Sequence, residues 1–321
     1  MENKTETVFE QLAKRGVTRR QFIRYCGMLA VVLGLPPSAV DTMANSLAAA
    51  QRLPVIWLEF QDCTGDTESF LRAYKRADLA VSGKTDPSLT ELILDVLSVD
   101  YHETLMAPAG AQAEKSRLNT IQNLAGQYVC IIEGSIPTAL NGYCCTIAGR
   151  TAISIAQEVT KNAKLTIALG SCAWDGGLAA AAPNPTGARG VKDVIPGLPN
   201  LINLPGCPAN VVNLVATIVY FLTYNQRPSM DSYGRPRFAY GSKIHDRCER
   251  KGKGEAKTYG DSTHRAGGCV KEMGCRGPET MSNCPTAKWN GGNCWDIGAG
   301  HGCIGCTNLG FWDRLSGFYK N

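Results

Sequence analysis

Short apolar runs alternate with amphipathic, helix-like segments through the first two thirds of the chain. The apolar runs predict five strands, at residues 54–60, 95–101, 128–134, 164–170 and 200–206. The segments between and after them predict helices at 67–74, 117–124, 148–163 and 209–225. Strands that alternate with helices are typical of a parallel, doubly wound sheet. In such sheets, functional residues gather in the loops beyond the carboxyl ends of the strands.

The pattern changes after residue 227. Residues 228–236 (PSMDSYGRP) resemble a connection, and the segment that follows is poor in long apolar runs but rich in glycine, cysteine, asparagine and charge. Such a segment buries little apolar surface by itself, so we expect it to fold around a cofactor or against a partner. We therefore predict an α/β domain over 51–227 and an irregular, mostly helix and coil domain over 228–321.

The first fifty residues have the pattern of an export signal. A basic stretch, 18-TRRQFIR-24, precedes the apolar run 25-YCGMLAVVLGL-35 and small residues at 45–50. This run is too short to cross a bilayer, and the paired arginines are typical of twin-arginine signals. The alternative is an ordinary amphipathic first helix. No other segment reaches membrane-spanning length, so we expect an exported protein that has no transmembrane anchor.

Charge and composition exclude little, but they argue against a nucleic-acid partner. The formal net charge is +5 over 321 residues, and the basic residues are spread along the chain. A nucleic-acid-binding domain normally concentrates such residues in a patch or stripe. The hydrophobic content of 44% is sufficient for one large or two modest cores.

Three of the fourteen cysteines follow predicted strands. Cys63 ends the first apolar run, and Thr64 and Gly65 separate it from Asp66, so that a carboxylate stands where a C-x-x-C motif would have its second thiol. Cys172 and Cys207 follow two later strands. Because parallel strands end at one edge of the sheet, these residues indicate a site there.

The C-terminal segment holds two further groups of possible metal ligands. His245, Cys248, Cys269 and Cys275 suit either a zinc ion or an iron–sulfur cluster with one imidazole ligand, and their spacing leaves both open. Removal of residues 1–50 would leave thirteen cysteines, an odd number that argues against a closed disulfide framework. An exported, zinc- or disulfide-stabilised binding protein remains one alternative. The second group is Cys284, Cys303 and Cys306.

A series of motifs resembles the small subunit of periplasmic nickel–iron hydrogenases over essentially the whole chain. The resemblance implies a flavodoxin-like N-terminal domain and three iron–sulfur clusters. These would relay electrons from hydrogen oxidation, in a large subunit that contains the nickel–iron site, to an external acceptor. The motifs include 61-QDCTGDTES-69, 133-EGSIP-137, 170-GSCAWDGG-177, 205-PGCP-208, 244-IHDRC-248, 282-SNCP-285 and 300-GHGCIGC-306.

The resemblance also implies the setting of the protein. The chain would contain no catalytic residue and would work in the periplasm as part of a heterodimer or a multiple of it. It would pass electrons to a soluble cytochrome or to a membrane-bound redox subunit. A hydrogen sensor with the same clusters is the alternative within the family, but sensors are normally cytoplasmic, and the export signal speaks against one.

The resemblance assigns ligands residue by residue. The distal four-iron cluster would take the group that begins at His245, and the medial cluster the group that begins at Cys284. The proximal four-iron cluster would be bound by Cys63, Cys172 and Cys207, with Asp66 at the place of the fourth cysteine. The alternative is that Asp66 faces solvent beside a three-iron cluster.

Two other departures from the family pattern affect the clusters. Asp296 replaces a proline beside the medial cluster, so Cys294 and Asp296 are candidates for a fourth medial ligand, and this cluster has either three or four irons. Gly65 and Gly177 stand where members that work in air carry two extra cysteines, so a six-cysteine proximal cluster is not expected.

Overall fold

A five-stranded parallel sheet forms the centre of the computed structural model, which describes residues 6–14, 16–72, 96–290 and 292–315. The strand order is β2-β1-β3-β7-β9, the flavodoxin-like order in which β1 and β3 flank the switch point. All five predicted strands and the predicted fold class are confirmed. The strands are β1 Leu53–Glu59, β2 Leu97–His102, β3 Val129–Glu133, β7 Leu165–Leu169 and β9 Leu201–Leu204.

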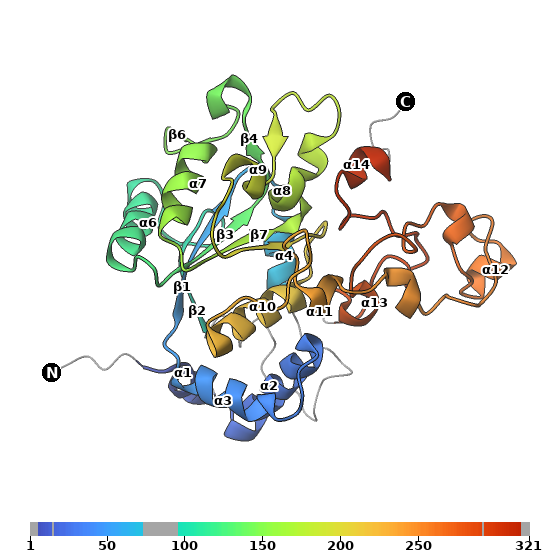
Figure 1. Cartoon of the computed structure of the whole chain (residues 1–321), viewed down its shortest axis with the longest axis horizontal. Helices are drawn as coiled ribbons and strands as arrows, with labels where there is room; N and C mark the ends of the chain where they lie inside the picture. The colour runs from blue at the N-terminus through green and yellow to red at the C-terminus, as the bar shows by residue number, and fades with distance from the viewer. Residues whose placement is uncertain (1–5, 15, 73–95, 291, 316–321) are drawn as a thin grey trace.

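Both faces of the sheet are covered, which explains why its strands are almost continuously apolar. Along β1, Val55 and Trp57 belong to the core on one face, whereas Ile56 and Leu58 belong to the core on the other. In Figure 1, α6 (Ala111–Asn123) and α7 (Ala152–Lys161) lie on one side of the strands, and α10 (Val211–Tyr224) lies on the opposite side.

The helix boundaries differ from the sequence pattern where local hydrogen bonding intervenes. The helix predicted from residue 148 begins only at Ala152, because Arg150–Thr151 pairs as β6 with β5 (Thr146–Ile147). The Thr151 side chain then accepts a hydrogen bond from the Ser154 amide and caps α7. The helix predicted from residue 67 is α4, Gly65–Leu71. The shorter elements of this domain are β4 Ile136–Pro137, η1 Ala139–Gly142, α8 Gly170–Asp175, η2 Gly177–Ala180, β8 Ala188–Arg189 and α9 Val191–Val194.

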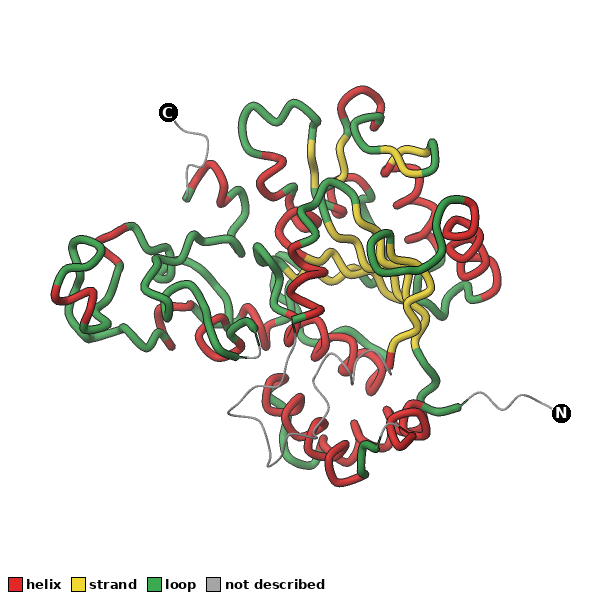
Figure 2. The backbone as a smooth tube through the Cα atoms, turned by 180° about the vertical axis from the view of Figure 1, so that it is seen from behind, coloured by secondary structure: helices red, strands yellow, loops and turns green. Residues whose placement is uncertain are grey.

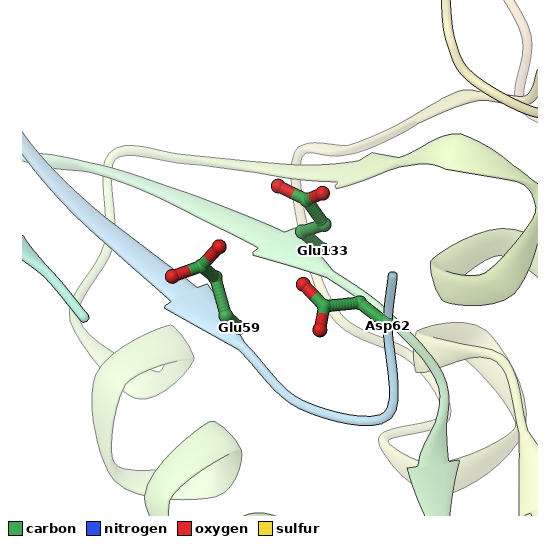
Figure 3. A group of neighbouring side chains, drawn as sticks. All are labelled: Glu59, Asp62 and Glu133. Carbon is green, nitrogen blue, oxygen red and sulfur yellow. The ribbon is translucent and has the colours of Figure 1, made fainter. Parts of the chain in front are cut away.

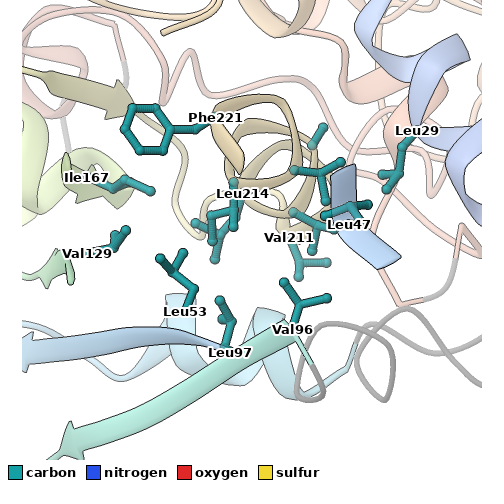
Figure 4. Close-up of a cluster of buried hydrophobic side chains, with 14 of the residues drawn as sticks. Leu29, Leu47, Leu53, Val96, Leu97, Val129, Ile167, Val211, Leu214 and Phe221 are labelled. Carbon is teal, nitrogen blue, oxygen red and sulfur yellow. The ribbon is translucent and has the colours of Figure 1, made fainter. Parts of the chain in front are cut away.

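The N-terminal segment folds as a helical cap over α10. It forms α1 (Val8–Lys14), α2 (Arg19–Leu33) and α3 (Ala39–Ala49), and α2 begins with a capping box between Thr18 and Gln21. Leu29 and Leu47 are 3% and 2% exposed, and they share one apolar cluster with residues of α10 (Figure 4). The paired arginines at the start of α2 remain exposed. The interpretation of residues 1–50 as an export signal stays a prediction.

The C-terminal region is a separate lobe of turns and short helices, as expected from its composition. Figure 1 shows it projecting from the sheet domain, with α12 at its outer end, and Figure 2 shows how little of it is helical. Within the described ranges, no helix is long and apolar enough to cross a membrane. The short helices are α11 Arg237–Tyr240, η3 Ile244–Arg247, α12 Ser262–Arg265, η4 Lys271–Met273, α13 Cys284–Ala287 and α14 Phe311–Arg314.

The buried residue Arg235 contacts both the sheet domain and the lobe and stabilises the segment that connects them. Arg235 is 4% exposed, and its Nε lies 2.8 Å from a carboxylate oxygen of Asp231. Its guanidinium lies 5.4 Å from the ring centre of Trp174 and donates to the carbonyl of Thr307 at 2.7 Å. The segment expected to be a connection is thus a packed turn that joins residues of both regions.

Substitutions on α2 test the docking of the cap. Leu29→Ala removes a side chain buried against the core, so we expect the free energy of opening the cap to fall by about 2–5 kcal/mol. Val31, on the same helix, is 79% exposed, and Val31→Ala should change this free energy by less than about 0.5 kcal/mol. Hydrogen exchange of the α2 amides in the full chain measures it. Equal protection in the two variants would contradict the docking.

Candidate metal centres

The proximal group lies at the carboxyl edge of the sheet. Cys63 and Asp66 follow β1, with Asp66 in the first turn of α4. Cys172 lies in α8, directly after β7, and Cys207 lies in the loop after β9. Burial, together with the charges of Asp66 and Cys63, raises the pKa of Cys207 to about 11. Burial and the charges of Asp66, Cys207 and Cys63 likewise raise the pKa of the Cys172 thiol, so these four side chains lie near enough to interact electrostatically.

The carboxylate of Asp66 faces the loops that carry the other proximal cysteines. Its Oδ1 accepts a hydrogen bond from the amide of Ala209 at 2.5 Å, just beyond Cys207. A Cβ atom at Gly170, whose φ is +81°, would lie 2.0 Å from Oδ2, so only glycine fits there. Burial and the charge of Glu133 raise the pKa of Asp66 well above its ordinary value. A carboxyl held in this way has an inward position suited to a ligand.

The buried carboxylate of Glu133, at the end of β3, fixes the position of this carboxyl. It accepts hydrogen bonds from the amides of Asp66 and Thr67, at 3.0 and 3.2 Å, and from the Thr67 hydroxyl at 2.5 Å. It also accepts the indole N–H of Trp57 on β1 at 3.0 Å. Glu133 is fully buried, so these donors satisfy a charge that would otherwise be costly to bury.

Two more carboxylates surround Glu133, as Figure 3 shows at the ends of β1 and β3. One oxygen each of Glu59, Asp62 and Glu133 lies within 4.8 Å of the others. Burial, with the charges of Glu133 and Glu59, raises the pKa of Asp62 to about 7. Burial also raises the pKa of Glu59, but the hydrogen bond and charge of His102 outweigh it, and the net pKa is lowered. The sequence analysis missed the roles of Glu59 and Asp62, although Asp62 directly precedes Cys63.

The medial group lines a cavity of about 340 Å³ between the sheet domain and the lobe. Burial raises the pKa of both the Cys284 and the Cys303 thiols to about 12. A single zinc ion, with ligands about 2.3 Å away, needs far less room than this cavity provides. The cavity therefore fits a cluster better than one ion. Its lining includes the predicted medial cysteines Cys284, Cys303 and Cys306, both candidates for a fourth ligand, Cys294 and Asp296, and the proximal residue Cys207.

The two candidates for the fourth medial ligand differ in their surroundings. Asp296 is exposed at the surface, as Cys294 is, but partial burial of its carboxyl raises its pKa, and the charge of this carboxyl in turn raises the pKa of Cys284 and of Cys207. The Cys294 thiol is exposed and accepts a hydrogen bond from the Asn290 amide group at 3.2 Å. Asp296 is thus the candidate that acts electrostatically on thiols of both neighbouring groups.

The distal group lies within the lobe. Burial raises the pKa of Cys248, and the charges of Cys269 and Cys275 contribute to the rise. The Cys248 sulfur accepts the Arg250 amide at 3.4 Å. His245 lies in η3 (Ile244–Arg247), which ends directly before Cys248.

Backbone amides also point at the sulfur atoms that link the lobe groups. The Cys275 sulfur accepts the amides of Gly277 at 3.4 Å and Cys303 at 3.3 Å, and the Cys303 sulfur accepts the Gly305 amide at 3.3 Å. Such N–H···S bonds stabilise negative sulfur and are one way in which proteins tune iron–sulfur clusters.

The remaining cysteines do not change this picture. All fourteen cysteines lie in the described residues and none forms a disulfide there, so the structure does not favour a disulfide-stabilised protein. Cys130, on β3, is fully buried in the core, where a cysteine packs as a small apolar side chain. At Gly177, with φ +55°, an added Cβ would lie 2.4 Å from the Cys172 sulfur, so a larger residue does not fit the present backbone.

Comparisons with known proteins match both the sheet domain and the lobe. The C-terminal family of NiFe/NiFeSe hydrogenase small subunits matches residues 240–319, and the NADH ubiquinone oxidoreductase 20 Kd subunit family matches residues 63–221. The chain is 44% identical to the periplasmic [NiFe] hydrogenase small subunit 1 of Nitratidesulfovibrio vulgaris, over 97% of this chain and 96% of that protein. It is 41% identical to the Hydrogenase-2 small chain of Escherichia coli K12, over 95% and 79%.

A solved relative has the same fold. A chain of the [NiFeSe]-hydrogenase of Dm. baculatum superposes with a TM-score of 0.72 at 32% identity, over 84% of this chain and 99% of that one. With the sequence relatives, this agreement covers both the sheet domain and the lobe. The chain belongs to the family of nickel–iron hydrogenase small subunits, the electron-transfer subunits of hydrogenases whose nickel–iron active site lies in a separate large subunit.

Proposed function

We propose that the chain binds three iron–sulfur clusters and relays electrons between the large subunit and an external acceptor. The proximal cluster takes Cys63, Asp66, Cys172 and Cys207, and the distal cluster takes His245, Cys248, Cys269 and Cys275. The medial cluster takes Cys284, Cys303 and Cys306, with Asp296 as a fourth ligand. Such clusters supply one-electron carriers whose potentials depend on charge, hydrogen bonds to sulfur and solvent exposure.

This relay is supported by the observation that each ligand group lies next to the following one. Cys207, a proximal residue, lines the same cavity as the medial thiols, and its charge contributes to the raised pKa of Cys306. The Cys303 amide, in the medial group, donates to the distal sulfur of Cys275 at 3.3 Å. Neighbouring groups are therefore adjacent along the row.

The residues of this chain prepare these sites by holding protonated donors in place. Buried thiols whose pKa values are raised are neutral before metal binding, and they release protons when they become ligands. Glu133 fixes the loop of Asp66, and the sulfur-directed amides stabilise the thiolates that form.

The setting follows from the same family assignment. Small subunits pair with a large nickel–iron subunit, and we place this heterodimer, or a multiple of it, in the periplasm. The twin-arginine segment would export the folded protein with its clusters inserted. Electrons would leave through the lobe to a soluble cytochrome or a membrane-bound redox subunit.

Substitution of Asp66 tests the proximal assignment. Asp66→Asn keeps the size of the side chain but removes the anionic ligand, so we expect the proximal cluster to lose an iron atom and its electron paramagnetic resonance signal to change. Asp66→Cys should restore four irons with a signal different from that of the wild type. Asp193→Asn, on exposed α9, is the matched control and should change neither. An unchanged proximal signal in both Asp66 variants would contradict ligation.

The nuclearity of the medial cluster is tested in the same way. We expect four irons in the wild type, and therefore no three-iron signal in the oxidised protein. Asp296→Asn should create that signal, whereas Cys294→Ser, at an exposed thiol, should not. A three-iron signal already present in the wild type would show that neither residue is a ligand, and its appearance only in Cys294→Ser would make Cys294 the ligand.

A further inference from the structure

Although basic residues occur along the whole chain, one segment of the lobe has an excess of positive charge that the sequence did not lead us to expect. Residues 243–272 contain eight Lys and Arg but five Asp and Glu, a net charge of +3 within the +5 of the whole chain. This segment carries η3, α12 and η4, and Figure 1 shows α12 at the end of the lobe that points away from the sheet domain.

Several of these cations lie beside the backbone of a proposed distal ligand. Cys269 is hydrogen-bonded through its amide and carbonyl to residues 254–256, with distances of 2.7 and 2.8 Å. Lys253 and Lys257 therefore flank residues 254–256, which pair with Cys269. Lys271 lies two residues after Cys269 in the sequence. All three lysines are exposed.

Three of the five carboxylates of the segment have partners, whereas six of its eight cations are exposed and form no ion pair among the described residues; the other two carboxylates, Glu255 and Glu272, are exposed among these cations. Asp246 pairs with Lys251 at 3.9 Å, Asp261 accepts the backbone amides of its own turn, and Glu249 accepts the Trp295 indole at 3.1 Å. Within the part of the chain that the structure describes, six exposed cations form no ion pair. They are Lys243, Arg247, Lys253, Lys257, Arg265 and Lys271, here called the distal basic surface.

We propose that the distal basic surface docks the acidic face of the redox protein that accepts the electrons. The inference rests on the proposed function, because it assumes that electrons leave near the distal ligands. Opposite charges accelerate encounter and orient the partner, and they repel a carrier of like charge. The surface thus selects an acidic acceptor and disfavours a basic cytochrome.

Binding to two probe proteins of opposite charge tests the proposal on the complex of this chain with its large subunit. The probes are a plant-type ferredoxin, which is acidic, and mitochondrial cytochrome c, which is basic. We expect tighter binding of ferredoxin, weakening as salt is raised. The triple variant Lys253→Glu, Lys257→Glu, Lys271→Glu should weaken it at least about tenfold at low salt.

A matched triple variant reverses three exposed lysines of the sheet domain, Lys115→Glu, Lys161→Glu and Lys192→Glu. It carries the same change in net charge, and we expect ferredoxin affinity to change less than about threefold. Hydrogen-driven reduction of a small dye should be equal in all three proteins, because a dye needs no docking surface.

Three results would overturn the proposal. They are equal ferredoxin binding by the two triple variants, tighter binding of cytochrome c than of ferredoxin by the wild type, and stronger binding to anionic lipid vesicles or DNA than to ferredoxin. Dye reduction shows whether such a result rejects the docking surface alone or the proposed function as well. If the wild-type complex reduces the dye, these results reject the docking surface alone, whereas a wild type that cannot reduce it contradicts the proposed function and this inference with it.

Discussion

The buried carboxylate of Glu133 joins the central sheet to the loop on which the proximal site depends. It accepts the indole of Trp57 from β1 and three donors from the first turn of α4, so the direction of Asp66 is fixed by β3 rather than by the loop itself. A buried anion that lost these donors would be strongly destabilising, so strand and helix are held in one arrangement. Beyond this edge, Cys207 lines the medial cavity. The Cys303 amide of the medial group donates a hydrogen bond to the sulfur of Cys275 in the distal group.

The site also concentrates acidic and thiol groups that repel one another when ionised. Burial keeps the pKa values of the thiols high, so the thiols carry a proton until a metal replaces it. Asp62 shows the same constraint next to the ligand loop, with a pKa raised to about 7 by burial and by its two acidic neighbours. His102 offsets part of this charge through its contact with Glu59. The sheet edge is therefore built to receive positive charge.

The sequence was sufficient for the sheet and for placing three cysteines after its strands, because both follow from short-range patterns. Apolar runs predicted all five strands, and the position of a cysteine after a strand predicted the site at the sheet edge. What failed depends on tertiary packing. The start of α7 is displaced by a small hairpin, and the packing of the N-terminal helices on α10 was not predicted. Two features could be found only in the folded chain, because their residues come from distant segments. They are the positions of Glu59 and Asp62 around Glu133, and the cavity that Cys207 shares with the medial thiols.

The central claim is that one continuous row of clusters carries electrons through this chain. The most direct measurement is the visible absorption of the purified complex with its large subunit as hydrogen is admitted. The account predicts a brown protein whose iron–sulfur absorption is bleached by hydrogen and restored by an added oxidant. A colourless protein, or a coloured one whose absorption does not respond to hydrogen, would contradict it.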